Sequence, residues 1–467
     1  KASKGGKKSN RESKRKIHPW LAGEEEAAAL SRQQVQQQQQ RRPRGRVGRR
    51  GRDRGRRRRR AAATWHASRG FDRLGVAAGV SLRWWRSRGP GGDGASMEGS
   101  QEGGGATAME GKVVDFHTHL VPRSWPTFAR RYGYGGFVHL DHDQEQVSVP
   151  GNARLLRDSE VIAEITPNSW DMALRVQDMD RAGVDLQVVS IVPELFAYWA
   201  KADDAADSAR ILNNGIAEQV KEFPDRFVAL GTLPMQAPEL AVAEMERCVV
   251  ELGFVGVVIG THVNQWQLDA PELITFWEMA EQLGCCVFVH PNVGETRIEE
   301  GAHALPQLVG VSAEMCHAAT CMLTSGLLDS FPTLKVCFAH GAGTFPYVRG
   351  QLEHGMATGS HCNLKHMVET LEPGQYRGRL FCDSIVHSPE ATKFLVDAMS
   401  SDAVVFGSDY PYPLGQGSKA AGAGAHGYNV SPSVHLPTLD ESTVKQVMGA
   451  NALQLLFGGN AEGAKKN

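Results

Sequence analysis

The feature that most constrains the fold is a regular alternation of two kinds of segment from Gly111 onward. Short apolar runs rich in β-branched residues, typical of buried strands, alternate with longer segments whose apolar residues lie three and four positions apart, as in helices. This alternation favours a parallel sheet, because each helix returns the chain to the end at which the next strand begins. Eight strands are predicted, at residues 113–119, 186–193, 227–234, 256–263, 285–291, 334–340, 380–386 and 403–411.

Amphipathic helices are predicted between these strands. They include residues 171–182, 205–221, 238–252, 313–330 and 389–400, and a final helix at residues 441–456. Eight βα repeats over about 350 residues indicate an α/β fold of the TIM (β/α)8 barrel type. The insertion at residues 122–168, between the first two strands, is too long for an ordinary βα loop. We expect it to form a small cap over the active site.

The first 108 residues differ from the rest in charge and complexity. They contain 27 of the 51 Lys and Arg residues but only 9 of the 52 Asp and Glu residues. With a glutamine run at residues 36–40 and an arginine run at residues 56–60, they have little apolar surface to offset the entropy lost on folding. We therefore expect a disordered extension at residues 1–108, a folded domain at residues 109–458 and a disordered tail at residues 459–467.

Two further interpretations of the extension remain open. Its arginine run has the charge density that binds nucleic acid or another anionic surface through phosphate contacts. Alternatively, Met97 and Met109 lie just before the first predicted strand. A start at Met109 would place that strand at the beginning of a compact domain and leave the residues upstream untranslated.

The eight cysteines lie between Cys248 and Cys382, in apolar runs and without a Cys-x-x-Cys pair. This distribution is typical of reduced core thiols rather than of disulfides. No apolar run approaches the length of about 18 residues that spans a membrane, and no signal peptide is recognisable. We expect a cytosolic protein without a membrane partner.

Ionisable side chains end four of the predicted strands. His117 and His119 lie in the first strand, two residues apart, and therefore point to the same face. His290 ends the fifth strand, His340 ends the sixth and Asp409 lies near the end of the eighth. Such barrels place their active sites at the C-terminal ends of the strands. A lone His-x-His pair is weak support for a metal site, but four strands that deliver ionisable side chains to one rim favour it.

Three imidazoles and one carboxylate suit a zinc-like divalent ion that keeps one position open. We expect the two histidines of the first strand and His290 to be ligands, with Asp409 completing the set. The fourth predicted strand, residues 256–263, has neither a lysine that could be carbamylated nor a glutamate that could bridge two metals, which favours a single ion. His340 is then free to act as a general acid or base, since an imidazole has a pKa near neutrality.

Longer motifs in the same region identify a family. They are residues 131–136 (RYGYGG), 198–201 (YWAK), 231–240 (GTLPMQAPEL), 260–264 (GTHVN) and 409–411 (DYP). With these motifs the chain, over about residues 110–458, resembles the amidohydrolase superfamily and, within it, the family of aminocarboxymuconate-semialdehyde decarboxylases.

The resemblance implies one zinc ion on His117, His119, His290 and Asp409, with His340 as the catalytic acid/base. It also implies a homodimer in which the neighbouring copy contributes to the pocket. The implied reaction is the non-oxidative decarboxylation of a small carboxylate substrate in tryptophan breakdown through the kynurenine pathway, without an organic cofactor.

Several positions depart from the family pattern. The two arginines expected to bind a substrate carboxylate correspond to Ala163 and Gln351, and a tryptophan of the pocket wall corresponds to Gln307. Loss of both arginines removes the charge-assisted, bidentate contacts that select a dicarboxylate. Arg157, where the family has lysine, and Arg349 are the candidates for binding the substrate instead, although each could equally be a surface arginine.

Three functions therefore remain open. The first is the zinc-dependent decarboxylase that the resemblance implies. The second keeps the metal but changes the reaction, to hydrolysis of a lactone or amide or to decarboxylation of a hydroxybenzoate-like acid. The third is a non-catalytic RNA-binding protein that acts through the basic extension. The complete set of metal-binding side chains argues against this third function.

Overall fold

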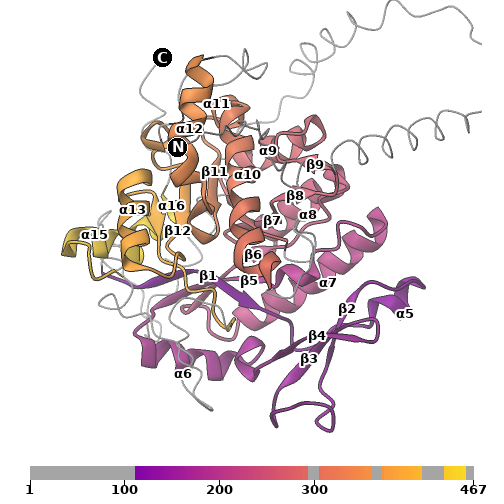
Figure 1. Ribbon diagram of the computed structural model, residues 1–467. Helices are drawn as coiled ribbons and strands as arrows, with labels where there is room; N and C mark the ends of the chain where they lie inside the picture. The colour runs from indigo at the N-terminus through magenta and orange to yellow at the C-terminus, as the bar shows by residue number, and fades with distance from the viewer. Residues whose placement is uncertain (1–110, 293–303, 359–370, 372, 413–435, 459–467) are drawn as a thin grey trace, which may run out of the picture. The chain divides into compact units, whose positions relative to one another are not determined.

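The computed structural model describes residues 111–292, 304–358, 371, 373–412 and 436–458 (Figure 1). The predicted extension at residues 1–108 and the predicted tail at residues 459–467 lie outside the described residues. Their disorder, and nucleic-acid binding by the arginine run, stay predictions.

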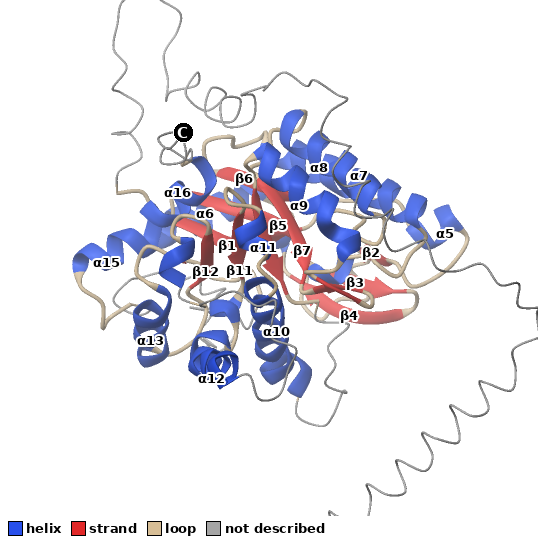
Figure 2. Cartoon of the chain, turned by 90° about the horizontal axis from the view of Figure 1, so that it is seen from above, coloured by secondary structure: helices blue, strands red, loops and turns tan. Residues whose placement is uncertain are grey.

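An eight-stranded parallel sheet lies at the centre of the described fold, with helices on its outer side (Figure 2). Its strands pair in chain order, as expected when each helix carries the chain to the adjacent position in the sheet. The strands are β1 (Val114–Leu120), β5 (Leu186–Ile191), β6 (Phe227–Gly231), β7 (Gly256–Gly260), β10 (Cys286–His290), β11 (Lys335–Phe338), β12 (Leu380–Asp383) and β13 (Val404–Val405). All eight predicted strands are confirmed.

The first and last strands approach each other and nearly close the sheet. The backbone N–H of Phe116 donates to Phe406 O (2.9 Å), and that of His119 donates to Tyr410 O (2.7 Å). In the opposite direction, Asp409 N donates to His117 O (2.8 Å). The chain after β13 therefore continues along β1, and the fold is the predicted TIM barrel.

The helices follow the strands as predicted, with local differences. They are α6 (Met172–Ala182), α7 (Ala202–Val220), α8 (Pro238–Val250), α9 (Ile274–Leu283), α10 (Val311–Thr324), α11 (Leu327–Ser330), α12 (Phe345–Thr358), α13 (Pro389–Met399), α15 (Glu441–Lys445) and α16 (Asn451–Phe457). The predicted helix at residues 313–330 is divided into α10 and α11, because Gly326 takes a left-handed conformation (φ 74°) that ends α10.

The insertion after β1 forms its own small layer. It contains α5 (Phe128–Tyr132) and an antiparallel sheet of β2 (Val138–Asp141), β3 (Ala153–Arg157) and β4 (Glu160–Ile165). Tyr134 donates a hydrogen bond of 2.9 Å to Asp204 on α7, and Arg131 forms an ion pair with Asp207 on the same helix. The insertion thus packs against α7, beside which it lies in Figure 1. That it caps the active site stays a prediction.

The cysteines lie as expected within the described residues. Seven are unpaired, and five of these are fully buried: Cys248, Cys285, Cys286, Cys337 and Cys382. The described helices include none with the length and apolar character required to cross a lipid bilayer.

Candidate metal centre

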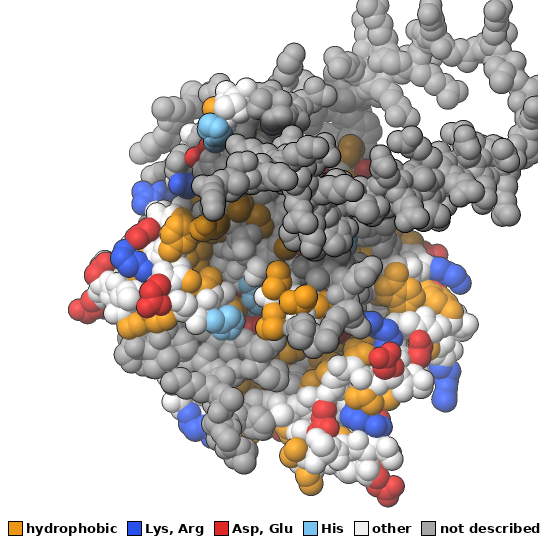
Figure 3. Space-filling view, viewed as in Figure 1, with side chains coloured by type: hydrophobic (Ala, Val, Ile, Leu, Met, Phe, Trp, Pro, Cys, Tyr) orange, Lys and Arg blue, Asp and Glu red, His pale blue; other side chains and the backbone are white. Residues whose placement is uncertain are grey.

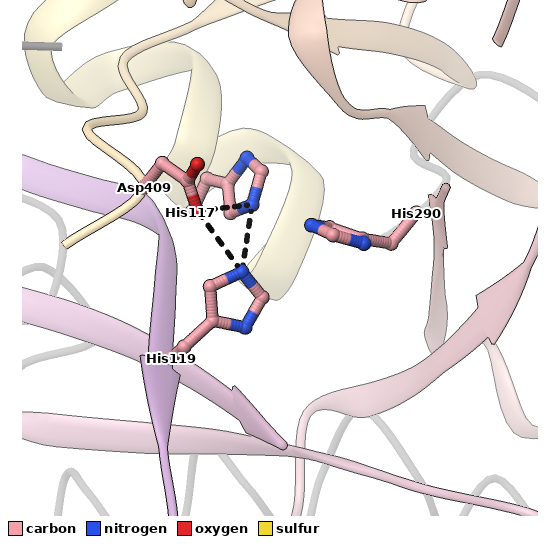
Figure 4. A group of neighbouring side chains, drawn as sticks. All are labelled: His117, His119, His290 and Asp409. Carbon is pink, nitrogen blue, oxygen red and sulfur yellow. Dashed lines mark hydrogen bonds and ion pairs between the residues drawn. The ribbon is translucent and has the colours of Figure 1, made fainter. Parts of the chain in front are cut away.

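The four predicted ligands meet at the C-terminal end of the barrel. His117 and His119 come from β1, His290 ends β10, and Asp409 lies in the segment after β13. One potential ligand atom from each lies within 4.8 Å of all the others, and all four residues are buried. Figure 4 shows the rings of His117 and His119 on one side with Asp409, and the ring of His290 facing them. The structure therefore brings together every residue that the strand ends predicted as a ligand.

The conformation of each segment explains why the side chains converge. Alternation along β1 places both histidines inside the barrel, while Thr118 between them points outward and donates to Val188 O (2.9 Å). Asp409 has a left-handed backbone (φ 62°), which is costly for a residue with a Cβ and persists only where neighbouring contacts hold it. Its neighbour Ser408 provides such contacts, because its backbone N–H and its hydroxyl both donate to the buried carboxylate of Asp115.

The hydrogen bonds of the outer ring nitrogens determine which nitrogen faces the centre. Nδ1 of His119 lies 3.2 Å from Ile191 O, and Nδ1 of His290 lies 2.9 Å from Pro291 O. A carbonyl oxygen only accepts, so both Nδ1 atoms carry the proton and both Nε2 atoms present a lone pair. Nδ1 of His117 lies 2.6 Å from a carboxylate oxygen of Asp383, with the same consequence.

The resulting donor set suits a cation. Nε2 of His117 lies 3.1 Å from Nε2 of His119, and these atoms lie 3.4 Å and 3.1 Å from Oδ1 of Asp409. Nε2 of His290 and Oδ1 of Asp409 are buried without a hydrogen bond among the described residues. Lone pairs from three nitrogens and one carboxylate would repel one another in an empty centre. They fit a divalent metal ion, whose ligands are neutral imidazoles and carboxylates.

Local electrostatics keep Asp409 and His290 in the protonation states that a metal requires. Burial raises the pKa of Asp409, but the neighbouring histidines lower it more, to about 2. Burial, with the neighbouring imidazoles, places the pKa of His290 well below its usual value. The carboxylate is therefore anionic and the His290 imidazole neutral at physiological pH, as coordination demands.

His340 lies beside the centre without belonging to the ligand set. Its ring centroid is 5.3 Å from that of His117 and 5.7 Å from that of His290. Burial lowers its pKa to about 4. It begins a turn in which His340, Gly341 and Ala342 all have positive φ values of 50°, 60° and 59°. A strained turn beside a metal centre fits a side chain held for chemistry, although the acid/base role itself stays a prediction.

The two candidate substrate arginines lie in different surroundings. Arg157 is half-buried at the end of β3, and no hydrogen bond or ion pair joins its guanidinium to another described residue. Arg349 on α12 donates to Ala398 O (3.0 Å) and pairs with Glu353 (3.5 Å). The bond to Ala398 joins α12 to the end of α13, whereas the pair with Glu353 lies within α12. The guanidinium of Arg349 is thus already bonded within the fold. Substrate binding by either arginine stays a prediction.

Three buried residues that support the centre were not predicted from the sequence. Asp383 ends β12 and Asp115 lies on β1, and each is a carboxylate at a position where the strand pattern could have suggested a role. Arg175 on α6 is fully buried; it donates to His119 O (2.7 Å), and its guanidinium carbon lies 4.7 Å from the ring centroid of Tyr410. Its helix position carries no such signal, because both contacts are made only in the folded barrel.

Comparison with known proteins agrees with this geometry. A family model described as amidohydrolase matches residues 114–458. The chain is 41% identical over 348 residues to 2-amino-3-carboxymuconate-6-semialdehyde decarboxylase of Dictyostelium discoideum, which covers 73% of this chain and 91% of the relative. It is 32% identical over 364 residues to the protein of that name in Caenorhabditis elegans, and this match covers 67% of this chain and 88% of the relative.

A solved structure shares the fold. It is a dihydroxybenzoic acid decarboxylase from a Polaromonas species with bound manganese and the inhibitor 2-nitroresorcinol; the TM-score is 0.55 at 21% identity, over 74% of this chain and 96% of the other. By its family match, its identity to two curated relatives and its His-His-His-Asp site, the chain belongs to the amidohydrolase family and, within it, to the metal-dependent decarboxylases of the aminocarboxymuconate-semialdehyde type.

Proposed function

We propose that this protein decarboxylates 2-amino-3-carboxymuconate-6-semialdehyde without oxidation and uses one zinc ion held by His117, His119, His290 and Asp409. The observation that carries the proposal is the convergence of four buried ligand atoms within 4.8 Å, in a chain 41% identical to a relative with this activity in its name. Three imidazoles and one carboxylate form a set that zinc accepts with a position left open.

The reaction breaks the bond between a carboxylate carbon and the conjugated chain, so that carbon dioxide leaves and a proton takes its place. When bound, the metal supplies Lewis acidity that polarises oxygen atoms of the substrate. His340 moves the proton, because its ring lies next to two ligand histidines while its own nitrogens are outside the ligand set. Its low pKa keeps the imidazole neutral at physiological pH, with one nitrogen able to accept and the other to donate.

A cation is needed for the remaining carboxylate of the substrate. We assign this role first to Arg157, since its guanidinium has no hydrogen-bonding or ionic partner in the described part of the chain. Arg349 is the second candidate, although its contacts with Ala398 and Glu353 favour a structural role. Replacing Arg157 with Gln should raise KM with little change in kcat, because the interaction lies away from the bond that breaks.

A homodimer is part of the proposal. Apolar side chains form part of the described surface (Figure 3), and three exposed ones come from the starts of two helices: Leu308 (60% exposed) and Val309 (50%), just before α10, and Tyr347 (82%) on α12. Thr344 N donates to Ser312 O (3.3 Å), which holds the starts of the two helices together. Where exposed apolar groups form one contiguous patch, they mark an interface. Sedimentation of the native protein should give twice the mass of the chain. The Tyr347→Asp variant should sediment with the mass of a single chain.

The substrate assay tests the reaction directly. The full chain, loaded with zinc, should remove the absorbance of 2-amino-3-carboxymuconate-6-semialdehyde and release one carbon dioxide for each molecule consumed. His340→Ala, loaded equally, is the matched control for metal-catalysed decay. Absence of turnover by the loaded native protein would reject this substrate.

A hydroxybenzoate-like acid is the second candidate substrate. Two positions favour it: Ala163 on β4 and Gln351 on α12 are uncharged, although they correspond to the arginines that the family resemblance assigns to a substrate carboxylate. Turnover of 2,6-dihydroxybenzoate at a higher kcat/KM than the semialdehyde would select this alternative.

A further inference from the structure

The carboxylate of Asp383 joins the metal centre to the turn that carries His340. Asp383 is fully buried at the end of β12. Its Oδ2 lies 2.6 Å from Nδ1 of His117, and its Oδ1 accepts hydrogen bonds of 3.0 Å from the backbone N–H groups of Gly341 and Ile385. One side chain thus contacts a ligand imidazole with one oxygen and the residue after His340 with the other.

The contact with His117 determines which ring nitrogen is protonated. A carboxylate oxygen accepts only, so the proton stays on Nδ1 and the lone pair on Nε2 faces His119 and Asp409. The same contact makes the imidazole more basic and holds its plane, which strengthens a metal ligand. Nδ1 of each of the other two ligand histidines faces a backbone carbonyl, and Nδ1 of His119 also lies 3.3 Å from Oγ of Ser190. Among the described ligands, His117 is the histidine whose Nδ1 faces a carboxylate.

The contact with Gly341 holds a turn that is otherwise unfavourable. His340 and Ala342 both have positive φ values, a conformation that is costly for residues with a Cβ and persists only where surrounding contacts impose it. The hydrogen bond from Gly341 N fixes the middle of this turn to β12, and Gly343 N donates to His340 O (2.8 Å) to close it. The position of the His340 ring therefore depends on Asp383.

The packing around Asp383 leaves little freedom for another orientation. A Cβ added to Gly407 would lie 2.8 Å from Cβ of His117 and 3.0 Å from Cβ of Asp383. His117, Asp383 and Gly407 are thus in close contact, and the carboxylate is held between its two partners.

We propose that Asp383 is a positioning residue that sets the metal affinity through His117 and the placement of the acid/base through the turn at His340. This inference rests on the divalent-metal centre of the proposed function but not on the identity of the substrate. It assigns no contact between Asp383 and the substrate.

Two substitutions separate the two effects. In Asp383→Asn the single amide oxygen can still accept from Gly341 N, but the amide nitrogen then faces His117 and makes Nδ1 an acceptor. The proton of His117 would move to Nε2, where the metal binds. Asp383→Ala removes both contacts. Cys382→Ala is the control, since Cys382 is buried on the same strand and points to the opposite face.

The experiment titrates the metal-free full chain with zinc against a chromophoric chelator and measures kcat at saturating zinc. We expect Asp383→Asn to bind zinc about 10- to 100-fold more weakly, the usual effect of losing such a partner, and to recover much of its kcat at saturating zinc. Asp383→Ala should bind zinc as weakly and keep a low kcat at saturation, because its turn is not held. Cys382→Ala should match the native protein in zinc affinity.

The melting temperature of the metal-free variants serves as the separate measure of folding. Native zinc affinity in Asp383→Asn, with only a lower melting temperature, would make Asp383 a structural residue and overturn the proposal. Equal recovery of kcat by the Asn and Ala variants at saturating zinc would overturn the proposed role of Asp383 in placing His340. If the protein does not turn over the proposed substrate, the zinc titration still tests the role of Asp383 in metal binding.

Discussion

The hydroxyl of Ser408 donates a hydrogen bond of 2.5 Å to Oδ2 of Asp115, while its backbone N–H donates one of 3.0 Å to Oδ1. Asp115 lies on β1 two residues before His117, and Ser408 directly precedes Asp409. The pair therefore joins the strand that provides two ligands to the segment that provides a third. β1 therefore contributes the ligands His117 and His119, and through Asp115 it also helps to position the ligand Asp409.

Removing the Ser408 hydroxyl should weaken this placement. In Ser408→Ala we expect zinc affinity to fall and the free energy of unfolding to drop by about 1.5–3 kcal/mol, the range for a hydrogen bond to a charged group. Chelator-competed zinc titration and denaturant unfolding measure the two effects. Ser442→Ala, at an exposed position on α15, is the control. Native zinc affinity in Ser408→Ala would show that the pair does not position Asp409.

His340→Ala should separate metal binding from catalysis. Because His340 is outside the ligand set, we expect zinc content to be native, while kcat falls by about 100- to 10,000-fold, the usual contribution of a general acid or base. Elemental analysis and the substrate assay are run on the same sample. An active, zinc-loaded variant would reject the acid/base role.

Arg175→Met should destabilise the barrel where it closes. The guanidinium holds His119 O and the ring of Tyr410, so it joins β1 to the segment after β13. We expect the free energy of unfolding to fall by about 3 kcal/mol, as when a charged hydrogen-bonding group is lost from a buried site.

Arg181→Met is the matched control for Arg175→Met. Arg181 lies on the same helix but its side chain is 66% exposed, so its loss should cost about 0–1 kcal/mol. Equal effects from the two substitutions in denaturant unfolding would show that the buried contacts of Arg175 add nothing.

Metal removal should lower the stability of the native protein. Without a cation, the lone pairs of three imidazoles and the Asp409 carboxylate face one another across the buried centre. Zinc at 100 times its Kd should add about 2.7 kcal/mol to the free energy of unfolding, seen as a higher melting temperature. The same zinc concentration should leave the melting temperature of His290→Ala nearly unchanged. An equal rise in both proteins would place the stabilising metal elsewhere.

The barrel and its ligands could be predicted because both depend on local patterns. Alternation along β1 places His117 and His119 on one face, and parallel pairing brings His290 and Asp409 to the same rim. These rules need no knowledge of which side chains touch.

The supporting residues could not be predicted in the same way. Arg175 contacts His119 and Tyr410, which are 56 and 235 positions away in the chain, and nothing near it in sequence indicates either contact. Asp383 was visible as a carboxylate at a strand end, but its partners His117 and Gly341 are 266 and 42 positions away, and the contact with Gly341 depends on a left-handed turn. The predicted strand at residues 256–263 ends early at Gly260, because the chain then forms a short hairpin of β8 (His262–Val263) and β9 (Trp266–Gln267). Asn264, whose φ is positive, lies in the turn between these two strands.

The metal content of the native protein and of Asp409→Ala tests the proposed ligand set most directly. Both proteins are purified in the same zinc-containing buffer, freed of loosely bound metal by gel filtration and measured by elemental analysis. We predict one zinc ion per native chain and almost none in Asp409→Ala, because the variant loses the single anionic ligand of the centre. One zinc ion per chain in both proteins would contradict the assignment.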